Sequence, residues 1–283
     1  MTNCRSSHCD NASEAHELPE AKGGVVPQLL VSVRNAQEAQ QAVAGGANWI
    51  DLKAPQQGPL GPVDINTARE VAEVFSTNHP LSAAAGELQD WQSQGKRIAA
   101  EVRPSLRKPN IDNSGHHLMG IPGIRLLKLG MAGCDSSPHW RDQWCGIQAE
   151  VQRAGKQLVA VAYADWKEAA APHPKQILEH ASSHGCETLL IDTYCKSQGT
   201  LLDCLCLRDL TSLLECARKG ALRTVLAGSL SINSLSQLIA LPVSLIGVRG
   251  AVCTGGRNGT LQKDRIKQFR HALRALPWGA TQQ

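Results

Sequence analysis

The chain has 283 residues, of which 42% are hydrophobic and 19% charged, and its formal net charge is +4. This length suits one large domain or two small ones, and the composition is sufficient for a substantial buried core. No apolar run approaches the ~18 residues of a membrane span, and the basic residues are scattered among only two Phe and two Tyr, so the sequence indicates neither a membrane protein nor a nucleic-acid binder.

Residues 1–26 are polar and show no periodicity, which predicts a flexible N-terminal extension before a catalytic domain at residues 27–283. No apolar h-region occurs in this stretch, so we expect no secretory signal. The ten cysteines form no C-x-x-C pair, and we interpret them as reduced thiols of a cytoplasmic protein. Cys4, His8 and Cys9 lie close together in the sequence and could contact a metal, but their spacing matches no known metal-site pattern, and we predict no metal there.

From residue 28 onward, strand-like apolar segments alternate with helix-like segments. The predicted strands are 28–33, 49–53, 81–85, 124–129, 158–163, 188–193, 223–227 and 245–248. The predicted helices are 35–44, 64–75, 89–96, 140–154, 175–184, 207–219, 232–239 and 261–276. Asp64 is a candidate N-cap, and glycines follow several of the helices as C-cap signals. The segment 101–123 is rich in Pro and Gly, and we expect mostly loop there.

Eight continuous apolar strands that alternate with helices are typical of a parallel sheet buried on both faces. Within about 250 residues this pattern predicts an α/β fold with a single (β/α)8 TIM barrel. The competing fold is a doubly wound open sheet, which usually carries a Gly-rich loop after its first strand. Here the first strand leads instead into Ser32-Val33-Arg34-Asn35, which favours the barrel.

Charged residues recur at the predicted carboxyl ends of the strands, where barrel enzymes carry their active sites. Asp51 and Lys53 are two residues apart, so their side chains project from the same face of a strand. The complete set of candidates for catalysis is Lys53, Lys128, Lys196, Asp51, Asp165 and Asp192. Burial and neighbouring positive charge depress the pKa of a lysine, and a neutral amine can form an imine with a carbonyl. The aspartates could transfer protons or hold the remaining ammonium groups.

The loops after the last two strands are the second half of the predicted site. Glycines at these positions allow backbone N–H groups to approach a phosphate. The candidate substrate- and phosphate-binding residues are Gly228, Ser229, Arg249, Gly250 and Ala251. Amines together with a phosphate site indicate carbonyl chemistry on a small phosphosugar.

The strand-end segments resemble those of the (5-formylfuran-3-yl)methyl phosphate synthase family. The segments that carry the resemblance are Asp51-Leu52-Lys53-Ala54-Pro55, Lys128-Leu129-Gly130, Tyr163-Ala164-Asp165, Asp192-Thr193 with Lys196, Leu226-Ala227-Gly228-Ser229-Leu230, and Gly247-Val248-Arg249-Gly250-Ala251. The resemblance covers roughly residues 28–270. The polar extension and the long 101–123 segment depart from the archaeal pattern of the family.

The resemblance implies a barrel enzyme that condenses two molecules of glyceraldehyde 3-phosphate into a furan aldehyde phosphate, with release of phosphate and water, for methanofuran-type C1 carrier biosynthesis. It implies a lyase with no metal and no cofactor. By resemblance, Lys53 is the Schiff-base residue and Lys128 the proton acceptor, and Asp51, Asp192 and Lys196 match other active-site positions.

Three matters stay open at this stage. Spacing alone allows Lys53, Lys128 or Lys196 to form the imine. A class I aldolase or a triose-phosphate isomerase-like enzyme could use the same lysines, and a catalytically silent barrel that binds sugar phosphate as a sensor is a hypothesis from another class. The oligomeric state is not encoded in these patterns, and a homo-oligomer is an open alternative because barrels often associate.

Overall fold

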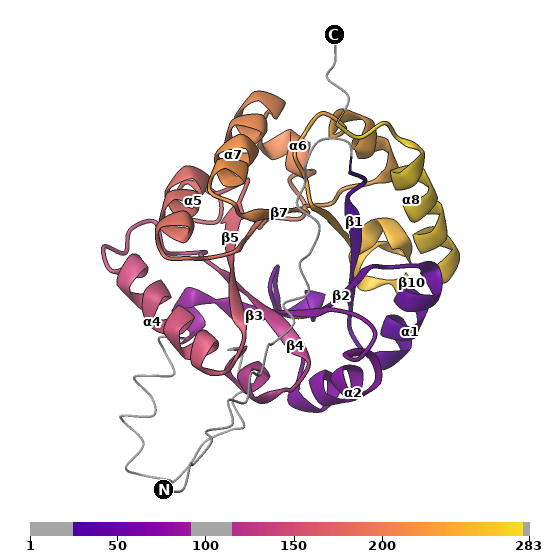
Figure 1. Ribbon diagram of the computed structural model, residues 1–283, viewed down its shortest axis with the longest axis horizontal. Helices are drawn as coiled ribbons and strands as arrows, with labels where there is room; N and C mark the ends of the chain where they lie inside the picture. The colour runs from indigo at the N-terminus through magenta and orange to yellow at the C-terminus, as the bar shows by residue number, and fades with distance from the viewer. Residues whose placement is uncertain (1–24, 92–114, 280–283) are drawn as a thin grey trace, which may run out of the picture.

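The computed structural model describes residues 25–91 and 115–279. Eight parallel strands form a closed barrel in chain order, as the sequence predicts (Figure 1). The strands are β1 Gln28–Val33, β2 Trp49–Leu52, β3 Leu81–Glu87, β4 Ile124–Gly130, β5 Gln157–Tyr163, β6 Thr188–Asp192, β7 Arg223–Leu226 and β8 Leu245–Val248. Residues 1–24 of the predicted extension, residues 92–96 of the predicted helix 89–96 and residues 101–114 of the loop-rich segment lie outside the described residues.

Helices surround the barrel as an outer ring (Figure 1). They are α1 Ala36–Gly45, α2 Ile65–Phe75, α4 Trp140–Arg153, α5 Pro174–Ser183, α6 Leu201–Cys204, α7 Leu207–Lys219 and α8 Lys263–Ala275. Short 3-10 helices are η1 Pro55–Gln57, η2 Gly115–Gly120, η3 Ile232–Gln237, η4 Gly250–Val252 and η5 Gly256–Asn258. None of the helices in the described ranges is long and apolar enough to cross a membrane.

Strand composition explains the barrel. In β5 every residue after Gln157 is buried, because one face packs into the barrel and the other against the outer helices. The parallel register places Asp51 of β2 beside Ser32 of β1 and beside Ser82 of β3. Three polar residues of neighbouring strands therefore lie at one level inside the barrel.

Local signals account for the helix boundaries. The side chain of Asn35 accepts a hydrogen bond from the Glu38 backbone N–H at the start of α1, and Asp64 caps α2 in the predicted way. At the end of α1, Gly46 adopts φ 90° and donates its N–H to α1 carbonyls, which is the usual role of glycine after a helix.

The structure differs from the predicted elements at several places, and the short helix α6 is one element that the sequence did not predict. Strand β3 continues to Glu87, two residues beyond the predicted end, because the chain stays paired with β4 through Gly130. The predicted helix at 232–239 is the 3-10 helix η3. Two short strands, β9 Cys253–Thr254 and β10 Thr260–Leu261, pair as an antiparallel hairpin that the glycine-rich sequence did not predict.

Candidate active site

A cavity of about 350 Å³ opens at the carboxyl ends of the strands. Ten of the eleven predicted site residues line it, and the exception is Asp165. The predicted residues in the lining are Asp51, Lys53, Lys128, Asp192, Lys196, Gly228, Ser229, Arg249, Gly250 and Ala251. Apolar residues such as Leu30, Leu190 and Val225 complete the wall.

Asp51 is fully buried and held by three partners. Ser32 Oγ donates to Asp51 Oδ2 at 2.8 Å, and Ser82 Oγ donates to Asp51 Oδ1 at 2.7 Å. The ammonium group of Lys128 forms an ion pair with Asp51 Oδ1. The carboxylate is thus fixed by β1, β3 and β4, and it fixes Lys128 in turn.

Lys128 is buried beside a second lysine. Burial lowers its pKa, the Asp51 carboxylate opposes that shift, and the nearby Lys53 lowers the pKa further. The net direction is downward, so the neutral amine is populated at lower pH than in an ordinary lysine. A neutral amine of this kind can accept a proton.

Asp192, at the end of β6, joins the two other lysines. Lys196 Nζ lies 2.6 Å from Asp192 Oδ1, and Lys53 Nζ lies 3.5 Å from Asp192 Oδ2. Burial alone would raise the pKa of Asp192, but Lys196 and Lys53 outweigh burial and hold the pKa well below its usual range. Asp192 is therefore a fixed anion between two amines. Lys53, Lys128, Lys196, Asp51 and Asp192 are called the lysine cluster below.

The three amines of the lysine cluster differ in how they are paired. Lys196 Nζ contacts Asp192, the Thr193 carbonyl and the Thr193 hydroxyl, which accounts for its three N–H donors. Lys128 is paired closely with Asp51. Among the described residues Lys53 Nζ has only the 3.5 Å contact with Asp192, so it is the least engaged amine in the cavity.

The backbone after β7 and β8 presents unpaired N–H groups to the cavity. Gly228 and Ser229 have φ of 97° and 54°, a left-handed turn that glycine adopts freely and serine rarely. Gly250 and Ala251 begin the 3-10 helix η4. Within the described part of the chain, the N–H groups of these four residues make no hydrogen bond to the protein. Such concave groups of backbone donors bind anions.

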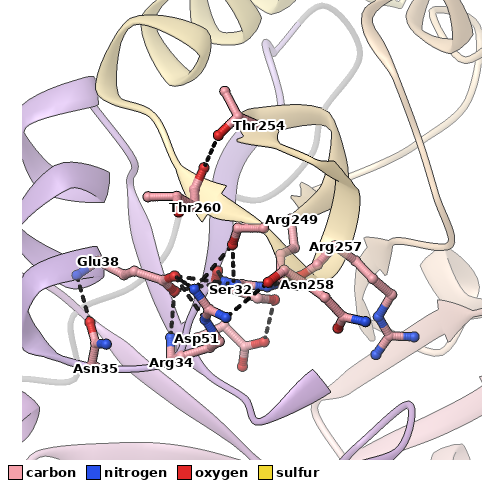
Figure 2. A network of polar contacts seen from close by, with 11 residues as sticks. Ser32, Arg34, Asn35, Glu38, Asp51, Arg249, Thr254, Arg257, Asn258 and Thr260 are labelled. Carbon is pink, nitrogen blue, oxygen red and sulfur yellow. Dashed lines mark hydrogen bonds and ion pairs between the residues drawn. The ribbon is translucent and has the colours of Figure 1, made fainter. Parts of the chain in front are cut away.

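Arg249 lines the cavity, but its guanidinium is committed to the protein (Figure 2). Arg249 Nη1 donates to Glu38 Oε2 at 2.8 Å and to the Ser32 carbonyl at 2.9 Å, and Nε donates to the Arg257 carbonyl at 2.6 Å. Arg34 pairs with the same Glu38 and donates to the carbonyls of Asn258 and Gly259. Glu38, Arg34 and Arg249, called the arginine network below, tie α1 to the loop after β8.

Asp165 does not reach the lysine cluster. Its two carboxylate oxygens accept hydrogen bonds from the backbone N–H groups of Tyr194 at 2.7 Å and Cys195 at 2.6 Å. Asp165 therefore anchors the loop that follows β6 and carries Lys196. A catalytic role for this residue stays a prediction, and its contacts are those of a positioning residue.

Sequence reasoning did not select Arg257 and Glu87. Arg257 lines the cavity, and its guanidinium donates weakly, at 3.3 Å, to the carbonyls of Pro55 and Gly58. A lone arginine between Gly256 and Gly259 was the signal that could have identified it.

Glu87 ends β3, and burial raises its pKa. Tyr163 Oη donates to its Oε1 at 2.6 Å, and the Ala132 N–H donates to its Oε2 at 2.9 Å. It lines a second cavity of about 430 Å³. The strand predicted from the sequence ends at Ala85, so Glu87 is not among the candidates at strand ends.

Solved structures that resemble this chain are barrel enzymes. Phosphoribosyl anthranilate isomerase from Thermotoga maritima superposes with a TM-score of 0.55 at 13% identity, covering 88% of this chain and 100% of that one. The 3-hexulose-6-phosphate synthase from Salmonella typhimurium gives a TM-score of 0.52 at 16% identity, covering 86% of this chain and 97% of that one. At these identities the likeness concerns the fold.

Sequence comparison is more specific. Proteins named (5-formylfuran-3-yl)methyl phosphate synthase match along almost their whole length: the one from Methanococcus maripaludis is 32% identical over 85% of this chain and 97% of its own. The one from Archaeoglobus fulgidus is 26% identical over 87% of this chain and 99% of its own. The family model described as 4-HFC-P synthase matches residues 29–270, and the chain therefore belongs to the 4-HFC-P synthase family.

Proposed function

We propose that this protein condenses two molecules of glyceraldehyde 3-phosphate into (5-formylfuran-3-yl)methyl phosphate through an imine on Lys53. The reaction releases one phosphate and two waters, which would make the enzyme a carbon–oxygen lyase acting on phosphates. The product would serve the biosynthesis of a methanofuran-type C1 carrier. The names of the relatives support the product, and the arrangement of the three amines in one cavity supports the chemistry.

The observation that carries the proposal is the unequal pairing of the lysines. An amine must be free of strong partners to attack a carbonyl, and Lys53 is the least engaged of the three. Lys53 contributes to lowering the pKa of both Lys128 and Lys196, so the three amines lie close enough to interact electrostatically. Lys53 is therefore the proposed nucleophile.

The connectivity of the product determines which carbons are joined. In the furan ring, carbon 2 of the triose that keeps its phosphate is bonded to carbon 3 of the triose that loses it. In the triose that loses its phosphate, an imine at carbon 1 makes the proton on carbon 2 more acidic. Removal of that proton gives an enamine, which expels phosphate from carbon 3. The triose that keeps its phosphate isomerises from an aldehyde to a ketone. Carbon 3 of the other triose then attacks this ketone at carbon 2. Ring closure, loss of two waters and hydrolysis of the imine release the aromatic aldehyde.

The remaining residues have matching roles. Neutral Lys128 accepts the proton from carbon 2 and becomes an ammonium group, which the Asp51 carboxylate stabilises. Burial lowers the pKa of Lys196, and Asp192 opposes that shift by stabilising its ammonium form. Lys196 lines the cavity where the leaving phosphate gains charge. The N–H groups of Gly228, Ser229, Gly250 and Ala251 hold the phosphate that is retained, with the guanidinium of Arg257 beside them.

The test is incubation of the purified protein with glyceraldehyde 3-phosphate. Furan formation is followed by ultraviolet absorbance and mass spectrometry, phosphate release is counted, and borohydride is added to a parallel sample to trap the imine. The proposal expects one phosphate per furan and a reduced adduct on Lys53. An adduct without furan would indicate the aldolase alternative. Absence of both the furan and the adduct would refute the proposed reaction.

A further inference from the structure

We propose that Cys145, His180 and His184 form a zinc site on the outer surface of the barrel, where it links α4 to α5. Cys145 lies in α4, His180 lies in α5, and His184 follows α5 directly. One donor atom from each residue lies within 4.8 Å of the other two. None of the three lines the catalytic cavity, so the site is separate from the proposed reaction.

Helix geometry brings the ligands together. His180 and His184 are four residues apart, so they project from the same side of one helical turn, and their ring centroids are 4.2 Å apart. Both α4 and α5 pack on β5, which places the two helices side by side (Figure 1). Cys145 of α4 thereby faces the two imidazoles of the α5 side.

The cysteine–histidine distance fits a common metal. Cys145 Sγ lies 3.5 Å from His180 Nε2. Zinc bonds of about 2.3 Å to sulfur and about 2.0–2.1 Å to nitrogen at a tetrahedral angle place those two atoms about 3.6 Å apart. Cys145 Sγ and His180 Nε2 therefore already have the separation of two zinc ligands. His184, which is exposed, would be the third protein ligand.

The surroundings prepare the two imidazoles for a metal. His184 Nδ1 lies 2.8 Å from the His180 carbonyl oxygen, which can only accept, so Nδ1 carries the proton and Nε2 keeps its lone pair. Trp140 and Trp144 pack edge-on against His180 and form an apolar wall behind the site.

The donor set selects the class of ion. One thiolate and two imidazoles suit Zn²⁺ and disfavour Mg²⁺ and Ca²⁺, which prefer oxygen ligands. The exposed side of His184 leaves a fourth position for water. Because the ligands come from two outer helices, the ion would stabilise the packing of α4 on α5 and leave the reaction rate unchanged.

The test is titration of the metal-free, reduced full-length protein with Co²⁺ as a spectroscopic substitute for zinc. Because Cys4, His8 and Cys9 could contribute ligands of their own, the titration is carried out in the C4S/C9S variant. We expect one equivalent of tetrahedral Co²⁺ with a thiolate-to-cobalt charge-transfer band. The band should disappear in C145S, and H184Q should weaken Co²⁺ binding at least tenfold.

Cys216→Ser provides the matched control, because Cys216 is an exposed thiol of α7 that does not belong to the group of three donor residues. Zinc should also raise the melting temperature of the C4S/C9S protein and of C216S, but not of C145S or H184Q. Absence of Co²⁺ binding, a charge-transfer band that survives C145S, or unchanged affinity in H184Q would each overturn the proposal.

Discussion

At the carboxyl end of the barrel, the lysine cluster and the arginine network both combine buried or partly buried cations with buried carboxylates, but the pairing differs between them. In the lysine cluster three amines share two aspartates, and Lys53 has only a 3.5 Å contact. In the arginine network the two guanidinium groups are satisfied by Glu38 and by backbone carbonyls.

The difference follows from the chemistry of the two side chains. A lysine can lose its proton when burial and like charge lower its pKa, whereas an arginine stays charged and donates in a fixed planar geometry. An incompletely paired lysine is therefore suited to reaction, and a fully paired arginine is suited to holding loops in place. The comparison predicts that changes in the lysine cluster affect rate and that changes in the arginine network affect stability.

The largest effect is expected for Lys53→Arg, which keeps the positive charge but removes the amine that forms an imine. Furan formation should fall by at least ~10³-fold and the borohydride adduct should vanish, because the other two lysines that line the cavity in the described residues are closely paired. Lys219→Arg, at an exposed lysine of α7, is the matched control. An adduct that persists in K53R would move the imine to another lysine.

Lys128→Met should lower kcat by roughly 10²–10³-fold, the usual contribution of a general base. Since burial depresses the pKa of Lys128, wild-type activity should rise with pH to a plateau reached below the ordinary lysine range. Asp51 raises that pKa, so Asp51→Asn should move the rising limb about one pH unit lower. If the rising limb of the pH–activity profile did not shift in D51N, Lys128 would be excluded as the group whose titration controls activity.

Glu38→Gln should cost about 3–5 kcal/mol of the free energy of unfolding, because it leaves a buried guanidinium without its counter-charge. Urea denaturation measures this loss. Arg34→Lys is the milder companion, since Arg34 is partly exposed and a surface pair contributes about 1 kcal/mol or less. Equal losses in the two variants would contradict the central place of Arg249 in the network.

Arg257→Ala should raise KM for glyceraldehyde 3-phosphate about tenfold with little change in kcat, as expected for loss of one charge-assisted phosphate contact. Arg274→Ala, at an exposed arginine of α8, is the control for the change in net charge. A fall in kcat at constant KM would instead place Arg257 in the chemical step.

The smallest effect is expected for Ser229→Gly. Glycine keeps the backbone N–H and suits the φ of 54°, so phosphate binding should change by less than about twofold in KM. Steady-state kinetics with glyceraldehyde 3-phosphate provide the measurement. A large rise in KM would assign the phosphate contact to the serine hydroxyl.

Much of the fold could be read from local patterns. The apolar strands, Asp64 as an N-cap and the glycines after the helices are signals that lie within a few residues of the elements they define. The antiparallel hairpin of β9 and β10 was missed because its strands are two residues each and carry no alternation. Strand ends were also less certain, and the extension of β3 to Glu87 came from its pairing with β4.

The sequence by itself predicted that three lysines and three aspartates would meet at one end of a barrel, because each lies at or just beyond the end of a predicted strand. The structure places all of them but Asp165 in the cavity lining. Only the tertiary structure decided how those groups are shared. The pairing of Arg249 with Glu38 spans 211 residues, and that of Tyr163 with Glu87 spans 76. Such pairings depend on the register of closed strands and on the space left between side chains, so Lys53 became distinct from Lys128 and Lys196 only in the folded barrel.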